Sequence, residues 1–133
     1  MLRLQQVWTG TECTVELAKQ YGIRIAFGTD ILFSAEGAAR QGKEFTKMGK
    51  WYSPAEALAM ATGTNGELLK LSGPRDPYPG KLGVIEEGAL ADLLLIEGDP
   101  LTNLQLIENA GENLVVIMKD GKIYKNLLPR GAK

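Results

Sequence analysis

The sequence predicts a mixed fold of class α+β, with a helix-rich first part and a strand-rich second part. Residues up to about 72 carry helix start and stop signals around one short β-rich run, which is the order of a β/α unit. Three prolines and two glycines in the nine residues 72–80 end that pattern. Beyond them, an apolar run and a hairpin signal indicate a small, mainly antiparallel sheet. We therefore expect two segments, residues 1–72 and residues 73–133.

The first elements predicted are a helix and a strand. Thr9 or Thr11 can cap a helix that runs to Tyr21, and Gly22 is a natural stop signal because glycine adopts the left-handed conformation easily. The β-branched and aromatic run 23–27, closed by a glycine, then predicts a short strand.

Further helices are predicted before the boundary. Residues 35–48 read as one helix, weakened by two internal glycines. Residues 53–56 (Ser-Pro-Ala-Glu) combine an N-cap serine, a proline at the first helical position and a glutamate three residues after the cap. Residues 62–65 are predicted to break that helix, and a shorter helix is expected to carry the leucines of residues 68–71.

Strand signals dominate after the boundary. Residues 83–85 predict a short strand, and Glu87-Gly88 a turn. The continuous apolar run 93–96 is typical of a strand covered on both faces. Residues 99–103 indicate a loop. Residues 114–125, with Asp-Gly in the middle, predict a hairpin with a type I′ turn.

Composition and charge narrow the possible functions. Of the 133 residues, 44% are hydrophobic and 23% charged, as in ordinary globular domains. The 15 basic and 16 acidic side chains leave a formal charge of -1, so no nucleic-acid partner is predicted. No stretch approaches the roughly 18 apolar residues of a membrane span, so no membrane partner is predicted.

Histidine and cysteine usage excludes several kinds of active site. The chain has no histidine, which excludes a histidine-ligated zinc site, a Ser-His-Asp triad and histidine acid–base catalysis within it. The single cysteine, Cys13, excludes an intramolecular disulfide. This usage suits a reducing compartment, and we expect a cytoplasmic location. No basic residue stands beside Cys13, so we expect a packing or surface role for it.

Short motifs follow one another along the chain in a fixed order. They are Gly28-Thr29-Asp30, Ser53-Pro54-Ala55-Glu56-Ala57-Leu58, Ala61-Thr62, Gly83 to Gly88, Ala91-Asp92-Leu93, Gly98-Asp99-Pro100-Leu101 and Val115 to Lys122. Each motif is common by itself, but their order over about residues 15–124 is specific. The series resembles the C-terminal end of the amidohydrolase superfamily, with the imidazolonepropionase-like and Xaa-Pro dipeptidase-like members most similar.

This resemblance implies a metal-dependent (β/α)8 barrel hydrolase with a small, composite β-sandwich domain built from both chain ends. Residues 23–28 then match the eighth barrel strand. Asp30 matches the aspartate that in the family binds the metal and activates the hydrolytic water. A carboxylate near a divalent ion can accept a proton from bound water, and active sites in such barrels lie at the C-terminal ends of the strands.

The other ligands of the family are missing. The His-x-His motif, the bridging lysine and the two later histidines do not occur, and a complete barrel takes about 250 residues. We therefore interpret the chain as a C-terminal piece, with residues 1–72 derived from the barrel and residues 73–133 from the sandwich. A truncated gene, a split subunit and a proteolytic product all fit. We expect the chain alone to be inactive and to bind no metal. The resemblance implies a divalent metal in the intact family, and zinc is the first choice.

Two other functions stay open beside this one. The chain could be a non-catalytic assembly module that self-associates, because a lone barrel strand and an apolar strand at residues 93–96 leave edges and apolar surface without partners. It could also be one subunit of a split enzyme, completed by a missing N-terminal barrel segment that carries the histidines and the lysine.

Several candidate residues have a plain structural interpretation as well. Asp30 could cap the next helix. Asp92 and Asp99 are expected to satisfy backbone donors at turns. Trp51 and Tyr52 could line a substrate mouth, but we favour a hydrophobic staple against the following helix. A solvated helix face is the expected role of the basic cluster Arg40, Lys43, Lys47 and Lys50.

Overall fold

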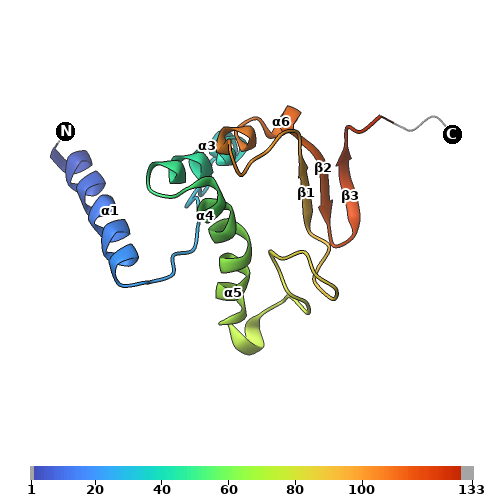
Figure 1. The fold of residues 1–133 in the computed structure, drawn as a ribbon, viewed down its shortest axis with the longest axis horizontal. Helices are drawn as coiled ribbons and strands as arrows, with labels where there is room; N and C mark the ends of the chain where they lie inside the picture. The colour runs from blue at the N-terminus through green and yellow to red at the C-terminus, as the bar shows by residue number, and fades with distance from the viewer. Residues whose placement is uncertain (1, 130–133) are drawn as a thin grey trace.

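The computed structural model describes residues 2–129 and has three parts along its longest axis (Figure 1). Helix α1 (Leu2–Gln20) stands at one end, short helices form a central body, and a three-stranded sheet lies at the other end. This mixture of helices and a small antiparallel sheet confirms the predicted fold class. No helix among the described residues is long and apolar enough to cross a membrane.

Helix α1 begins at Leu2, so the predicted start at Thr9 or Thr11 is wrong. Residues 2–8 contain no glycine or proline and include leucine, arginine and glutamine, which favour helix. The hydroxyl of Thr11 instead donates to the carbonyl four residues earlier, at 3.0 Å, inside the helix.

The end of α1 is a Schellman motif, as the glycine signal predicts. Gly22 has a φ of 63°, and its N–H donates to the carbonyl of Lys19 at 3.3 Å. The N–H of Ile23 donates to the carbonyl of Ala18 at 2.8 Å. These bonds satisfy the last carbonyls of the helix and turn the chain toward the central body.

The helix predicted over residues 35–48 is divided, which corrects that prediction. Arg40 leaves the helical region with φ -106° and ψ 13°. At Gly42 the backbone of residue 107 packs directly against this segment, since a Cβ at residue 42 would lie 2.4 Å from the carbonyl oxygen of Ile107. The resulting elements are α2 (Ala35–Ala39), α3 (Gln41–Thr46) and the 3-10 turn η1 (Lys47–Lys50).

The next helical stretch confirms the predicted start and corrects the predicted break. Ser53 and Glu56 form a capping box at the start of α4 (Pro54–Ala59). Residues 62–65 do not end the helix. A single π-helical turn, η2 (Met60–Thr64), joins α4 to α5 (Asn65–Lys70). Below α5, a short 3-10 turn, η3 (Gly73–Arg75), begins the irregular segment rich in proline.

The sheet has the order β1-β2-β3, with both pairs antiparallel. Its strands are β1 (Leu93–Ile96), β2 (Leu114–Lys119) and β3 (Lys122–Asn126). Asp120 and Gly121 have φ values of 49° and 73°, as a type I′ turn requires, so the hairpin prediction is confirmed. Between β1 and β2 lie the 3-10 turn η4 (Leu104–Ile107) and α6 (Ala110–Asn113).

Two predictions about the strands after residue 80 are wrong. Residues 83–85 form no strand, since only an isolated bridge between Lys81 and Ala89 forms in this loop. Strand β1 is also not covered on both faces, because Leu94 is 57% exposed and Leu95 49% exposed. A continuous apolar run is typical of a strand whose two faces are covered by other layers of the fold. Among the described residues, no such layers cover both faces of β1.

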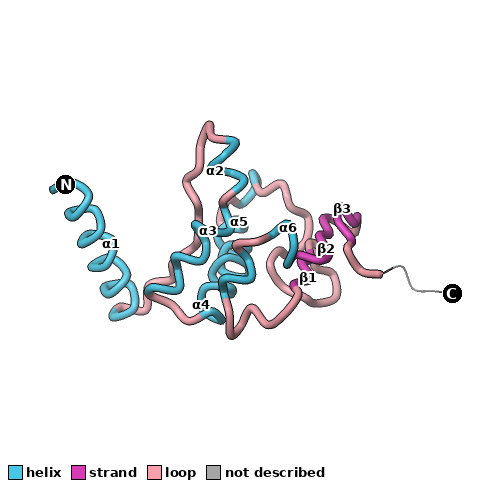
Figure 2. Tube along the Cα trace, turned by 90° about the horizontal axis from the view of Figure 1, so that it is seen from above, coloured by secondary structure: helices cyan, strands magenta, loops and turns pink. Residues whose placement is uncertain are grey.

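The core joins the helices to the connection between β1 and β2. Phe45 of α3, Ala57 of α4 and Leu104 of η4 are buried together. Phe27 packs on this cluster, with its ring edge-on to Phe45 at 5.1 Å between centroids. The loop leading into α2 projects from one side of the body (Figure 2).

Candidate functional site

The segment between α1 and α2 carries the predicted site, and it is not a strand. Residues 23–28 have no regular structure, so the predicted strand is wrong. Strands need a second backbone to pair with, and no neighbouring strand pairs with this segment in the described part of the chain. Its side chains nevertheless anchor it, since Phe27 is partly buried against the core.

One side chain replaces a neighbouring strand at Phe27. The Phe27 N–H donates to Oδ1 of Asn65 at 2.9 Å, and Nδ2 of Asn65 donates to the Phe27 carbonyl at 2.9 Å. Two opposed residues of an antiparallel pair exchange the same two kinds of bond. Asn65 lies 38 residues further along the chain, directly after the π-helical turn.

Asp30 lies three residues beyond this anchor and is exposed. Its φ of 51° is in the left-handed region, which aspartate adopts more readily than most residues. The alternative interpretation of Asp30 as a helix cap is wrong. Ser34 caps α2 instead, accepting from the N–H of Gly37 at 2.9 Å.

The residues around Asp30 do not make a complete metal site. Within residues 2–129, no three side chains of histidine, cysteine, aspartate or glutamate come together as a metal would require. One carboxylate leaves most positions around a divalent ion to water. This chain's donor set therefore does not fit a resident metal by itself.

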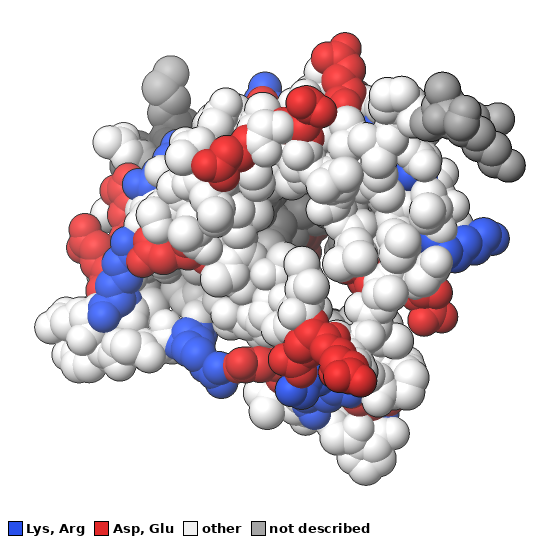
Figure 3. Space-filling model, turned by 45° about the vertical axis from the view of Figure 1, so that its right-hand side comes forward, with Lys and Arg blue, Asp and Glu red and all other residues white. Residues whose placement is uncertain are grey.

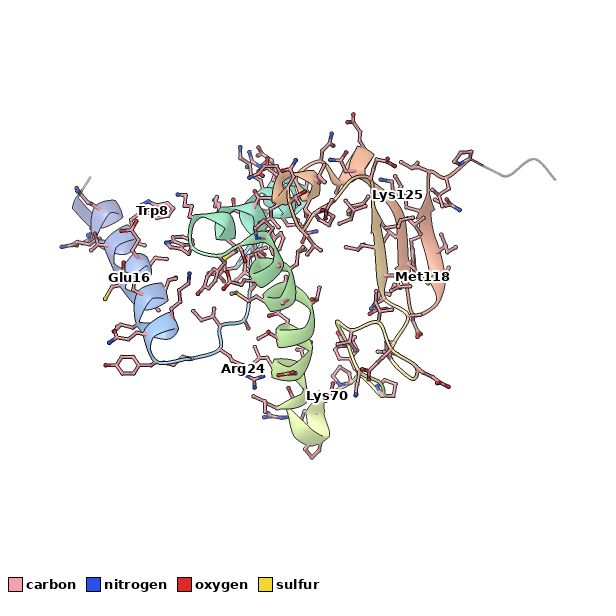
Figure 4. All side chains as sticks on the ribbon, in the orientation of Figure 1. Trp8, Glu16, Arg24, Lys70, Met118 and Lys125 are labelled. Carbon is pink, nitrogen blue, oxygen red and sulfur yellow. The ribbon has the colours of Figure 1, made fainter. Side chains whose placement is uncertain are left out.

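A cavity of about 620 Å³ separates α1 from residues 25–29. Trp51 and Tyr52 line it, and Asp30 does not. Trp8 extends from α1 toward the central helices (Figure 4), with its ring centroid 6.5 Å from that of Trp51. The ammonium group of Lys50 lies 4.2 Å from the Trp8 ring centroid. Aromatic and cation–π contacts thus connect α1 to the body.

Tyr52 has the staple role that we favour, since it packs on the core cluster that contains Ala57 in the helix that follows. It also lines the cavity. Partial burial, followed by the nearby charge of Glu56, raises the pKa of the Tyr52 hydroxyl. The ammonium group of Lys19 lies 4.5 Å from the ring centroid.

The structural interpretations of Asp92 and Asp99 are confirmed. Oδ1 of Asp92 accepts from the N–H of Asp120 at 2.7 Å, and Lys119 lies 3.4 Å from its other oxygen. The backbone hydrogen bond first, and then Lys119, lower the pKa of Asp92. Oδ1 of Asp99 accepts from the N–H of Leu101 at 2.9 Å in a turn.

The remaining candidates lie on the surface. Cys13 is exposed and makes no disulfide. Arg40 pairs with Glu36 at 3.2 Å, and Lys47 pairs with Glu44, as expected of a solvated helix face.

Sequence reasoning missed Asn65. Its sequence neighbours, Thr-Gly-Thr before and glycine after, favour a helix break, and the prediction treated the asparagine as part of that break. Asparagine in the middle of a helical stretch was the available signal, because its amide competes for backbone groups.

Known proteins resemble this chain over most of its length. A "Putative aminohydrolase" of Methanothermobacter thermautotrophicus is 29% identical over 115 residues, which are 80% of this chain and 27% of that protein. A crystal structure of an amidohydrolase is 36% identical, has a TM-score of 0.72, and is matched by 87% of this chain over 26% of its own length. A prolidase crystallised with N-methylphosphonate-L-proline is 29% identical and has a TM-score of 0.69. That match covers 85% of this chain and 26% of the prolidase chain.

The chain thus spans about a quarter of the length of these relatives. The sequence profile of the amidohydrolase family matches residues 9–124, which include the Asp30 segment, the capping box and the hairpin. The chain belongs to the amidohydrolase family.

Proposed function

We propose that this chain is the C-terminal part of a metal-dependent hydrolase of C–N bonds. Residues 1–72 would supply the last β/α unit of a (β/α)8 barrel, and residues 73–133 the C-terminal part of its β-sandwich. The observation that carries this proposal is the segment 23–28, which leads to Asp30, is anchored at Phe27 as a strand would be, and has no strand partner within residues 2–129. The chain spans only about a quarter of the length of each relative, which supports its being a part of such an enzyme.

Asp30 is the residue that this chain would contribute to catalysis. Its carboxylate would accept a proton from the hydrolytic water and act as one ligand of the metal, which in this family is typically required. The remaining ligands and the lysine would come from residues outside this chain. We therefore propose that the isolated chain has no hydrolytic activity.

Dipeptides with a C-terminal proline are the first substrates to test. The prolidase relative was crystallised with N-methylphosphonate-L-proline, which is built on the same imino acid. Cyclic amides are the second class, because they present the same kind of C–N bond. The residues of this chain alone favour neither class.

Exposed apolar surface supports association with more polypeptide. Phe33 is 106% exposed and Ile85 91% exposed, and in strand β1 Leu94 is 57% and Leu95 49% exposed. Charged side chains lie mostly around the rim of the face in Figure 3, with uncharged surface between them. A missing N-terminal barrel segment would cover such surface, as would a second copy of the chain. Sedimentation of the purified chain as a compact monomer at micromolar concentration would contradict self-association, and failure to co-purify with a co-expressed N-terminal barrel segment would contradict the other form.

The test is a chimera with the prolidase relative. The matched quarter of that protein is replaced by residues 9–124 of this chain, and the product is assayed on proline dipeptides with added zinc. We expect zinc-dependent turnover, and Asp30→Asn should lower kcat by about 10²- to 10⁴-fold. Asp99→Asn is the matched control, since asparagine can also accept the Leu101 N–H, and it should retain activity. Equal turnover by Asp30→Asn and the parent chimera would overturn the role of Asp30.

A further inference from the structure

We propose that Asn65 is a positioning residue for the catalytic segment: its carboxamide substitutes for a neighbouring strand at Phe27 and thereby sets where Asp30 is presented. This inference rests on the proposed function for the role of Asp30. Asn65 itself does not line the cavity beside residues 25–29 and would act only through the backbone of Phe27.

The geometry of the contact is that of a specific clamp. Both hydrogen bonds are 2.9 Å long and partly buried, where a lost partner is more costly than at an exposed site. The ring of Phe27 is held at the same time by Phe45. Three residues span at most about 11 Å of chain, so fixing Phe27 limits the positions that Asp30 can reach.

The π-helical turn explains how Asn65 comes to face this segment. The N–H of Asn65 donates to the carbonyl of Met60, five residues earlier, and to that of Thr62, three residues earlier, instead of to the carbonyl four residues earlier. Each residue of an α-helix turns by about 100°, so one extra residue in the turn changes the face on which all later side chains lie. Without the π turn, Asn65 would point elsewhere.

The loop that follows the helices holds this turn in place. A Cβ at Gly66 would lie 2.4 Å from the carbonyl oxygen of Leu82, and one at Gly63 would lie 3.7 Å from the carbonyl oxygen of Gly83. The helix can approach this loop so closely at Gly66 only because that residue has no side chain. The π turn, the loop and the clamp therefore form one unit.

The chemistry of the clamp requires an amide. Asparagine accepts one hydrogen bond and donates another from adjacent atoms, which matches one backbone N–H and one carbonyl. An ionised aspartate of the same size can only accept, and leucine can do neither. Substitutions at residue 65 therefore separate the hydrogen bonds from the space that the side chain fills.

The test measures amide hydrogen exchange and relaxation by NMR on the full 133-residue chain. We expect Asn65→Ala to speed exchange of the Phe27 amide at least 10-fold and to increase the mobility of Gly28, Thr29 and Asp30. The amides of the β2–β3 hairpin should not change. Asn126→Ala is the matched control: it also removes an acceptor, for the N–H of Leu128, but should leave Phe27 unaffected.

Asn65→Asp keeps the test decisive if the alanine variant unfolds. It retains the acceptor for the Phe27 N–H and lacks the donor for the Phe27 carbonyl, so we expect the signals of residues 28–30 to shift while the urea midpoint of the hairpin stays unchanged. Unchanged signals at Phe27 and Asp30 in this variant would overturn the proposal, as would uniform loss of protection across the whole chain.

Failure of this proposal and failure of the proposed function are distinguishable. The clamp is measured in the chain alone, without substrate or metal, whereas the role of Asp30 is measured by turnover of the chimera. In the chimera, Asn65→Asp should lower kcat with little change in KM, and it should leave bound zinc in place.

Discussion

The β2–β3 hairpin and the segment 23–28 have similar β-favouring side chains but different backbone partners. In the hairpin, each strand finds its partner two residues away across Asp120-Gly121. Within the described residues, segment 23–28 pairs with no second strand, and its Phe27 backbone bonds the amide of Asn65 instead. The difference teaches that β propensity selects an extended chain only where a partner is present, because the ladder hydrogen bonds belong to two strands.

The two regions also differ in what stabilises them. The hairpin depends on turn conformation and ladder hydrogen bonds, and the apolar side chains of β3 are exposed, Ile123 at 51% and Tyr124 at 65%. The segment depends on tertiary packing, since Phe27 lies on Phe45 and bonds a residue 38 positions away. Variants in the two places should therefore differ in how much they lower the free energy of unfolding.

The largest effect is expected from the packing behind the segment. Phe45→Ala removes a ring that is 6% exposed and should lower the free energy of unfolding by about 3–5 kcal/mol, measured by urea denaturation. Phe33→Ala, at a fully exposed ring, is the control and should change it by less than about 0.5 kcal/mol. Similar losses from the two variants would mean that the core around Phe45 is not the anchor.

A smaller effect is expected from the turn of the hairpin. Gly121 has a φ of 73°, so Gly121→Ala should lower the free energy of unfolding by about 1–2 kcal/mol in the same assay. Gly10→Ala is the matched control, because Gly10 lies within α1 with open space around it and should gain about 1 kcal/mol. Effects of the same sign would remove the distinction between turn and helix glycines.

The smallest effect expected is a loss of hairpin stability at low pH. The bond from the Asp120 N–H and the nearby Lys119 lower the pKa of Asp92 below its usual 3.8. A lowered folded pKa gives stability that is present above pH 3.8 and is lost as the pH falls through the folded value. The stability of the hairpin, followed by NMR, should therefore fall as the pH is lowered from 3.8 through the pKa of Asp92 in the folded chain. Asp92→Asn should abolish that part of the decline, and an unchanged acid profile in this variant would refute it.

Local signals predicted part of the fold well. The capping box at Ser53 and the type I′ turn at Asp120-Gly121 are each decided by a few adjacent residues, and both are confirmed. The end of α1 at Gly22 is decided in the same way. These features need no information from the rest of the molecule.

Features that depend on distant contacts were predicted poorly. The π turn before Asn65 and the break at Arg40 occur where glycines let another part of the backbone come close, at Leu82 and at Ile107. Residues 23–27 form no strand because no second strand pairs with them within the described residues. A motif identifies Asp30, whereas the contact that anchors its segment joins Phe27 to a residue 38 positions away, which no local pattern indicates.

The central claim is that this chain contributes one catalytic carboxylate to a site completed by residues outside it. The most direct measurement is the zinc content and the hydrolysis of proline dipeptides by the purified 133-residue chain, in parallel with its Asp30→Asn variant. The account predicts no stoichiometric zinc and no turnover above background in either. One tightly held zinc per chain, with turnover that disappears in Asp30→Asn, would contradict it.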